Sequence, residues 1–205
     1  MNAEQRHKAL KKIRDEVLVL KSPLVTQRKK NNMFPVIGEG SDFAEIMFVG
    51  EAPGANEAKQ GRPFVGASGK FLNEMLEEAG IQRDDVYITN IVKDRPPENR
   101  DPLPTEIEAY GVFLDRQIEI IQPKVIATLG RFSMEYVMRR FGLESEIEPI
   151  SKAHGKSFAA KASYGSIEII PLYHPAVALY NGSMREPLKK DFEILHQRAE
   201  TPRKK

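Results

Sequence analysis

Four short runs of apolar residues recur along the chain and predict buried strands. They span residues 46–49, 86–92, 124–129 and 167–173. Short runs with apolar and β-branched residues at consecutive positions suit strands that are covered on both faces. The first run stops at Gly50 and the third at Gly130, where the chain is expected to turn.

Amphipathic segments with helical spacing separate these runs. We expect helices over residues 3–18, 68–79, 105–121, 131–141 and 187–198. Ser68 is a plausible N-cap for the second helix, and Thr105 with Glu108 matches a capping box for the third. Residues 19–44 read as irregular. Strands that alternate with helices predict an α/β fold with a mostly parallel sheet covered on both faces.

The chain has 205 residues, so one domain is the default, and we expect it to cover residues 1–200 before a basic, flexible tail at 201–205. The absence of cysteine excludes disulfides, thiol nucleophiles, cysteine zinc sites and an all-cysteine iron–sulfur cluster. No apolar stretch is long enough for a membrane helix, and the charged start lacks the apolar part of a signal peptide. We therefore expect a cytoplasmic protein.

The small net charge of +2 hides basic ends. Residues 1–30 carry nine Lys and Arg against three Asp and Glu, and residues 185–205 carry seven against four. Such ends either contact a polyanion or are simply solvated, and charge alone favours solvation.

Three polar residues follow three of the predicted strands. Glu51 lies in the tight turn after the first strand, Asn90 ends the second, and His174 follows the fourth. Since ligands of such sheets bind outside the carboxyl ends of the strands, the three side chains are expected to converge on one crevice. Taken singly, each has a plainer reading as a solvated acid, a local backbone partner or a structural histidine.

Residues 61–66, with the sequence GRPFVG, form a loop rich in glycine that is not a phosphate loop. The motif G-x-x-x-x-G-K-[ST] fails because Phe71 follows Lys70 and Phe64 stands at the place of the first glycine. Phe64 is unusual in such a loop. It is either a plug over the core or a stacking surface for a ligand ring.

With these motifs the sequence resembles the family 4 uracil-DNA glycosylases, over about residues 16–196. The matching strings are MFVGEAPG (47–54), GRPFVG (61–66), YITN (87–90), RPP (95–97) with NR (99–100), and HP (174–175). The resemblance implies a three-layer α/β/α sandwich with a central four-stranded, mostly parallel sheet. It implies removal of flipped-out uracil from DNA in base excision repair, with uracil-containing DNA as the partner and free uracil as the product.

The resemblance also assigns candidate site residues. Glu51 and His174 match the catalytic residues of the family. The residues expected to hold uracil are Phe64, Asn90, Glu57 and Ala52. Thymine would be excluded near its C5 methyl group by Glu57 or by the backbone at Ala52, and the sequence does not decide between them. No metal is implied at this site.

DNA contacts are expected from cations and a wedge on the rim. The cations are Lys93, Arg95, Arg100 and Arg185. Leu179 and Tyr180 are candidate wedge residues, by analogy with side chains that other proteins insert between base steps. Capping of the last helix is an equally good reading of this pair. We expect a monomer without a membrane partner.

One departure from the family is large. Its members usually hold a [4Fe–4S] cluster through four cysteines, and the matching positions here are Val19, Ser22, Asp94 and Tyr110. These side chains cannot supply four thiolates, so we expect no cluster and no other cofactor. We expect Val19 and Tyr110 to fill the space by packing. No histidine lies between Asp94 and Tyr110, so we expect ordinary hydrolytic turnover without a covalent link to DNA. An inactive DNA-binding protein of the same fold and a nucleotide-binding enzyme are the alternatives.

Overall fold

The structure is a computed structural model that describes the backbone of residues 1–199 and the side chains up to Leu195. The described residues form one six-stranded sheet in the order β1-β3-β2-β4-β6-β5. The central strands β3 (Tyr87–Asn90), β2 (Ile46–Gly50), β4 (Val125–Leu129) and β6 (Gly165–Leu172) are parallel. All four predicted strands are confirmed. The expected tail at 201–205 lies outside the described residues.

Two antiparallel edge strands extend the sheet beyond the predicted four. β1 (Glu39–Gly40) pairs with β3, and β5 (Phe158–Ala162) pairs with β6. β1 has only two residues, and β5, with the sequence FAAKA, alternates between half-buried and exposed positions and has alanine at three of its five positions. Neither strand produces the continuous apolar run by which buried strands are recognised.

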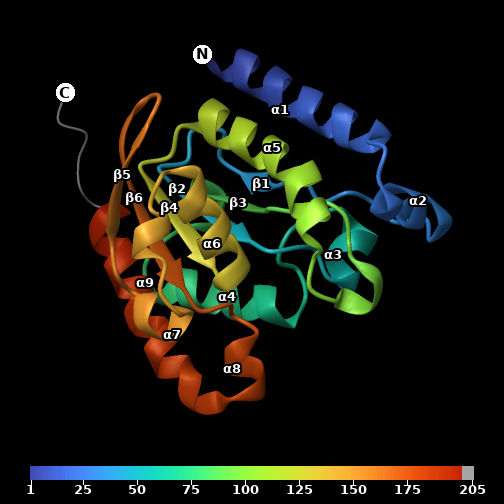
Figure 1. The fold of residues 1–205 in the computed structure, drawn as a ribbon. Helices are drawn as coiled ribbons and strands as arrows, with labels where there is room; N and C mark the ends of the chain where they lie inside the picture. Colours follow the sequence, from blue (N-terminus) through green and yellow to red (C-terminus); the bar gives the residue numbers. More distant parts are fainter. Residues whose placement is uncertain (200–205) are drawn as a thin grey trace.

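Helices cover both faces of the sheet, as expected for an α/β/α sandwich (Figure 1). They are α1 (Ala3–Val19), α2 (Pro23–Lys30), α3 (Ala55–Gln60), α4 (Ala67–Glu78), α5 (Pro104–Ile121), α6 (Arg131–Arg140), α7 (Ile150–Ala153), α8 (Val177–Tyr180) and α9 (Arg185–Ala199), with short 3-10 turns at Arg83–Asp85, Pro97–Asn99, Glu144–Glu146 and Gly182–Met184. α1, α5 and α6 share one core cluster with the sheet, and α4 and α9 share the other.

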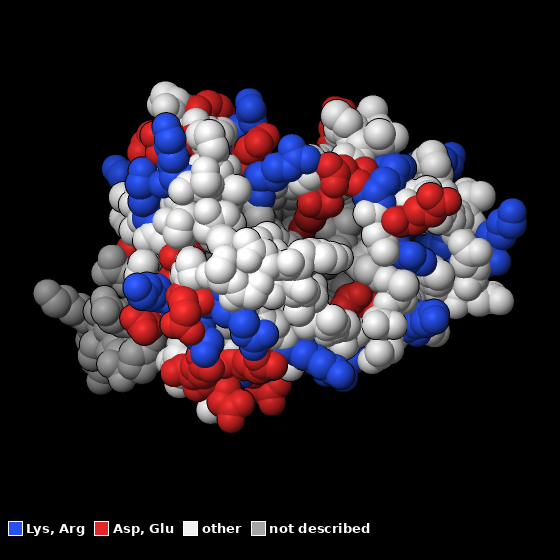
Figure 2. Space-filling view, turned by 90° about the horizontal axis from the view of Figure 1, so that it is seen from below, with Lys and Arg blue, Asp and Glu red and all other residues white. Residues whose placement is uncertain are grey.

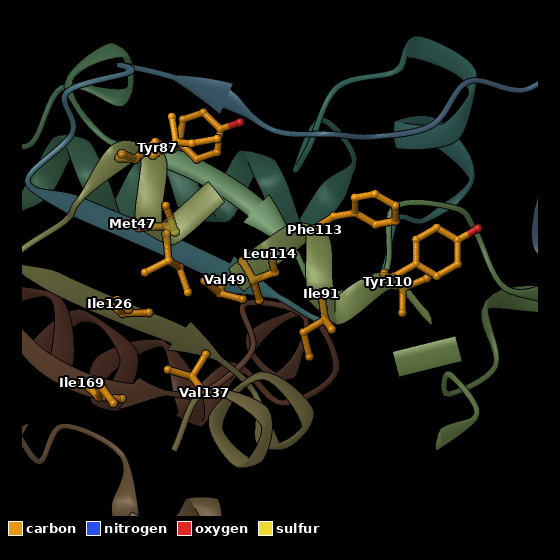
Figure 3. Close-up of a cluster of buried hydrophobic side chains, with 14 of the residues drawn as sticks. Met47, Val49, Tyr87, Ile91, Tyr110, Phe113, Leu114, Ile126, Val137 and Ile169 are labelled. Atoms are coloured by element: carbon orange, nitrogen blue, oxygen red, sulfur yellow. The ribbon is translucent and has the colours of Figure 1, made fainter. Parts of the chain in front are cut away.

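The two clusters arise from the alternation of side chains along each strand. On β2, Met47 and Val49 belong to the cluster under α1 and α5, whereas Phe48 belongs to the cluster under α4 and α9. Figure 3 shows the first cluster, in which Met47 and Ile126 of neighbouring strands gather with helix residues such as Leu114. Because both faces of these strands are apolar and covered, polar groups gather at the strand ends instead.

Three local predictions are wrong. α2 falls in the segment read as irregular, and it begins because the Ser22 side chain accepts the N–H of Leu24 and Pro23 occupies the first helical position. Ser68 lies inside α4, whose N-cap is Gly66. α5 begins one residue before Thr105, and its capping contact runs from the N–H of Leu103 to the Glu106 carboxylate. Both helices have a proline at the first helical position, Pro23 in α2 and Pro104 in α5.

No helix among the described residues is long and apolar enough to cross a membrane.

A candidate active site at the strand ends

A cavity of about 300 Å³ opens at the carboxyl ends of β2, β3 and β6. It is lined by Glu51, Ala52, Gly54, Glu57, Phe64, Ser68, Asn90, Asn99, His174 and Ala176. Every residue predicted to be catalytic or to hold uracil is in this set. Its size is at the lower end of ligand pockets, which suits a small ring. Figure 2 shows a hollow in the face seen from below, with acidic and basic side chains along its edges.

Glu51 brings a half-buried carboxyl group into this cavity. Burial, together with a smaller effect of the nearby Asp101 carboxylate, raises the pKa of Glu51 to about 7, and the Arg131 guanidinium acts in the opposite direction. No hydrogen bond to the Glu51 carboxyl group forms among the residues that the structure describes. A carboxyl group that titrates near neutral pH and faces a cavity is suited to polarise water or to stabilise a developing cation.

Asp101 and Arg131 are the electrostatic partners of Glu51 that sequence reasoning missed. They form an exposed ion pair of 2.8 Å between the loop before α5 and the start of α6. Arg131 directly follows Gly130 at the end of the third predicted strand. Because the carboxyl ends of parallel strands meet at one edge of the sheet, the place of Arg131 after a strand predicts that it lies near Glu51, Asn90 and His174. Asp101 carries no such signal.

His174 has a defined proton arrangement. The N–H of Ala176 donates to its Nδ1 at 3.1 Å, so a neutral ring carries its proton on Nε2. Burial lowers the pKa of His174 to about 4, although Glu57 acts in the opposite direction. His174 is therefore neutral at physiological pH, with Nε2–H as its free donor.

Phe64 is a strained aromatic residue between the core and the cavity. Its backbone has φ of 49°, in the left-handed region that few non-glycine residues adopt. Phe64 is only 6% exposed, packs in the cluster under α4 and α9 and lines the cavity. The centroid of its ring lies 5.8 Å from that of His174. Phe64 therefore packs in the core, as a plug would, and also lines the cavity, which leaves its stacking role a prediction.

Glu57 fixes the loop that carries Phe64. Its Oε1 accepts the N–H groups of Val65 at 2.9 Å and Gly66 at 2.7 Å, next to the start of α4. Gly69 allows the same loop to lie on α4, because a Cβ there would be 1.9 Å from the Phe64 carbonyl oxygen. Strain at an active-site residue persists when surrounding contacts determine it, as they do here.

Asn90 ends β3 with its side chain 2% exposed and facing the cavity. Among the described residues no hydrogen bond reaches its amide group. A Cβ added to Gly50 would lie 2.3 Å from Asn90 Oδ1 and 2.9 Å from the Phe64 ring. Glycine at this position therefore allows the amide and the ring to meet at the end of β2.

The predicted DNA contacts lie outside the cavity lining, and one of them is wrong. Lys93 is 0% exposed and donates three hydrogen bonds inside the protein, so it cannot reach a phosphate. Arg100 is partly exposed in a bidentate pair with Glu106, and Arg95 donates to Asn99.

The remaining rim candidates follow the cavity-lining Ala176 in the chain. Leu179 is 43% and Tyr180 90% exposed on α8. Arg185, at the start of α9, pairs with Glu74 and lies 4.5 Å above the Phe71 ring. Large apolar side chains this exposed next to a cavity are available to a partner.

The four positions that match the family's cluster ligands do not suit an iron–sulfur cluster. Asp94 is fully buried and accepts two hydrogen bonds from Arg28 and one, at 2.6 Å, from the Tyr110 hydroxyl. Ser22 caps α2 and lies beside Tyr110. Tyr110 is fully buried, as predicted, but Val19 is 75% exposed and is not the expected filler. An ion pair with a tyrosine hydroxyl fills this region instead. Among the described residues no group of three metal-ligating side chains exists.

Comparisons with known proteins agree with this architecture. Residues 37–196 match the model of the uracil DNA glycosylase superfamily. A type-4 uracil-DNA glycosylase of Sulfurisphaera tokodaii is 49% identical over 96% of this chain and 87% of its own length. Those of Archaeoglobus fulgidus and Thermotoga maritima are 47% and 44% identical, over 81% and 77% of this chain and 81% and 79% of their own. With a family match over most of its length and type-4 relatives at this level of identity, the chain belongs to the uracil-DNA glycosylase superfamily.

Proposed function

We propose that this protein hydrolyses the N-glycosidic bond of deoxyuridine in DNA, leaving an abasic site for base excision repair. The observation that carries the proposal is the composition of the cavity. A free carboxyl group, a free amide, an Nε2–H donor and an aromatic ring converge on a space of about 300 Å³. The relatives named type-4 uracil-DNA glycosylase support the same activity.

Asn90 reads the base in this proposal. Its amide N–H donates to O4 of uracil, and its carbonyl oxygen accepts from N3–H. Cytosine presents the reverse pattern and leaves both groups unpaired, at a cost of about 1–3 kcal/mol each. Stacking on Phe64 contributes about 1–3 kcal/mol and repays part of the few kcal/mol needed to flip the nucleotide. Ala52 and Glu57 both line the cavity, and in this proposal one of them excludes the C5 methyl group of thymine.

Glu51 and His174 carry the bond cleavage. As the bond breaks, the sugar becomes cationic and the departing base anionic. Ionised Glu51 stabilises the cation and orients or deprotonates the attacking water. Neutral His174 donates Nε2–H to O2 of the departing uracil, and a preorganised donor of this kind contributes about 3 kcal/mol.

DNA lies across the rim of the cavity. Tyr180 or Leu179 fills the space that the flipped nucleotide leaves, because these apolar side chains are exposed beside Ala176. The phosphates are contacted by Arg95, Arg100 and Arg185. Arg100 and Arg185 release the carboxylates of Glu106 and Glu74 when they bind phosphate.

The active protein contains no iron–sulfur cluster in this proposal. The absence of cysteine and the Arg28–Asp94 pair at the matching positions support it. The purified protein should be colourless, without absorbance near about 400 nm and without bound iron. The monomeric state and the cytoplasmic location remain predictions from the sequence.

The test is cleavage of a uracil-containing oligonucleotide, followed by alkali to break abasic sites. Strand scission at the uracil position, lost in Glu51→Gln, supports the proposal. Tight binding of uracil-containing DNA without scission would instead identify an inactive DNA-binding protein of the same fold. Asn90→Asp removes the amide donor and should weaken discrimination between uracil and cytosine. An unchanged preference for uracil would exclude the base-reading role of Asn90.

A further inference from the structure

Lys93 is fully buried and contacts the end of β3, where the cavity-lining residue Asn90 lies. No ion pair to its ammonium forms among the described residues, and burial lowers the pKa of Lys93 well below its ordinary value. Burying an amino group without a counter-ion is costly, and a methionine of similar volume would pack here without that cost. A lysine at this position therefore calls for a reason other than packing.

The hydrogen bonds of Lys93 supply one. Nζ donates to Thr89 Oγ1 at 2.8 Å, to the carbonyl oxygen of Asn90 at 2.6 Å and to Gln117 Oε1 at 2.6 Å. All three partners accept. Thr89 gives its own proton to the Ile37 carbonyl at 2.7 Å, and the Gln117 amide nitrogen donates to the same carbonyl at 2.9 Å. Three acceptors match the three protons of an ammonium group and leave none of its donors unused.

These bonds hold the peptide that carries the base-reading residue. The carbonyl of Asn90 is held by Lys93, and the N–H of the same peptide unit, on Ile91, donates to the Gly50 carbonyl at 3.0 Å. The next N–H, of Val92, donates to the Glu51 carbonyl at 3.0 Å. The turn after β3 is thus held by Lys93 and by the backbone of Gly50 and Glu51 at the end of β2.

We propose that Lys93 is a positioning residue for uracil recognition, which sets the orientation of the Asn90 amide by clamping the carbonyl of the same residue. This inference rests on the proposed function and extends it to a residue that does not line the cavity. Lys93 touches neither base nor sugar. Its action is to hold Asn90 in the binding geometry before uracil arrives, which lowers the ordering cost of recognition.

The first test replaces Lys93 by methionine, which keeps volume and removes the amino group. We expect kcat on a uracil-containing duplex to fall by about tenfold to a hundredfold, because small displacements of a positioned group cost this much. The affinity for free uracil should fall by about tenfold or more, while KM for DNA stays within about threefold, because the phosphate contacts are unaffected.

The matched control is Ile13→Ala on α1, a fully buried residue that does not line the cavity. It should lower the melting temperature and leave kcat and uracil affinity unchanged well below that temperature. If Lys93→Met also changes only the melting temperature, Lys93 is merely structural and the inference is overturned. A wild-type protein that does not cleave uracil-containing DNA would reject the proposed function instead.

The absence of cysteine permits a chemical rescue. In Lys93→Cys the new thiol is unique, and alkylation with 2-bromoethylamine in denaturant followed by refolding restores an amine at nearly the length of lysine. Aminoethylated protein should regain most of the lost kcat and uracil affinity, whereas protein alkylated with iodoacetamide should not. Wild-type protein taken through the same refolding is the reference. Equal activity of the two adducts would overturn the inference.

A second variant covers a Lys93→Met chain that fails to fold. Thr89→Val removes one acceptor of Nζ and keeps the shape of the side chain. It should weaken binding of free uracil by several-fold with KM for DNA unchanged. Wild-type uracil affinity in this variant would also count against the clamp.

Discussion

The pKa of Glu51 makes a pH dependence the sharpest consequence of the site geometry. Only the ionised carboxylate can stabilise a cationic sugar or activate water, and burial raises its pKa to about 7. The pKa of His174 is about 4, so this residue does not titrate in the same range. The pH dependence of kcat/KM between pH 5 and 9 should therefore report Glu51 in the free enzyme.

The expected magnitude follows from the ionised fraction of Glu51. With a pKa of about 7, about a tenth of the molecules are ionised at pH 6 and about nine-tenths at pH 8. kcat/KM should thus rise about tenfold between pH 6 and pH 8 and level off above that. Glu51→Gln should remove this rise and lower kcat by about a hundredfold or more, since the charge that stabilises the transition state is lost.

Asp101 and Arg131 allow the assignment to be tested by opposite shifts. Asp101→Asn removes the charge that raises the pKa of Glu51, so the midpoint should move to lower pH. Arg131→Met removes the charge that lowers it, so the midpoint should move to higher pH. The ratio of kcat/KM at pH 6 to that at pH 8, measured for each variant on one duplex at fixed salt, cancels any loss of DNA affinity that does not depend on pH.

Glu148→Gln is the control for removing a surface acid, because Glu148 pairs with Lys156 and is absent from the cavity lining. Its profile should match that of the wild type. A wild-type midpoint near pH 4.5, or movement of both partner variants in the same direction, would refute the role of Glu51 as the titrating group.

Three further predictions test the surroundings of the site. Gly50→Ala should abolish uracil binding measured by calorimetry while DNA affinity stays, because a Cβ would lie 2.3 Å from Asn90 Oδ1; normal uracil affinity would contradict the close approach. Arg28→Met leaves the Asp94 carboxylate buried without its partner and should lower the free energy of unfolding in urea by about 3–5 kcal/mol. A loss no larger than that of an exposed ion pair, such as the one removed by Lys156→Met, would mean that the buried pair does not stabilise the fold. Because burial disfavours the ionised form of Glu51 in the folded protein, Glu51→Gln should raise the melting temperature at pH 8. This gain should vanish as the pH falls through 7 toward 4.5, where the carboxyl group is protonated in the folded and the unfolded protein. Equal gains at pH 8 and pH 4.5 would argue against a raised pKa of Glu51.

The sequence predicts the parts of this molecule that depend on a repeating pattern. Four buried strands follow from their apolar runs, and the convergence of Glu51, Asn90 and His174 follows from the rule that parallel strand ends meet. It does not predict a contact that needs a fixed distance in space. Asp101 lies eleven positions after Asn90 with no local signal, and its effect on Glu51 arises only when the loop before α5 folds back toward the cavity.

Lys93 is a second residue whose environment could not be predicted from the sequence. A lysine in a loop after a strand is exposed far more often than buried, and the place of Lys93 on a candidate rim loop predicts a DNA contact. Its burial becomes intelligible only with Thr89 and Gln117 in place, because these residues supply acceptors from β3 and α5 at once. The charge of a residue can be read from the sequence, but whether that charge faces solvent depends on partners that are distant along the chain.

The contacts of the neighbouring Asp94 explain what holds the structure together at the positions where the family usually has cysteines. Arg28 binds Asp94 and also donates to the Leu18 carbonyl at 2.9 Å, so one guanidinium connects the end of α1, α2 and the loop after β3. The Tyr110 hydroxyl adds α5 to the same connection. Apolar packing would bury the same surface at lower cost, but it would not fix the register between these segments as directed hydrogen bonds do. The loop between Asn90 and Asn99 connects two residues that line the cavity. We attribute its placement to two adjacent buried side chains: Lys93 binds the end of the sheet, and Asp94 binds Arg28 of the N-terminal helices.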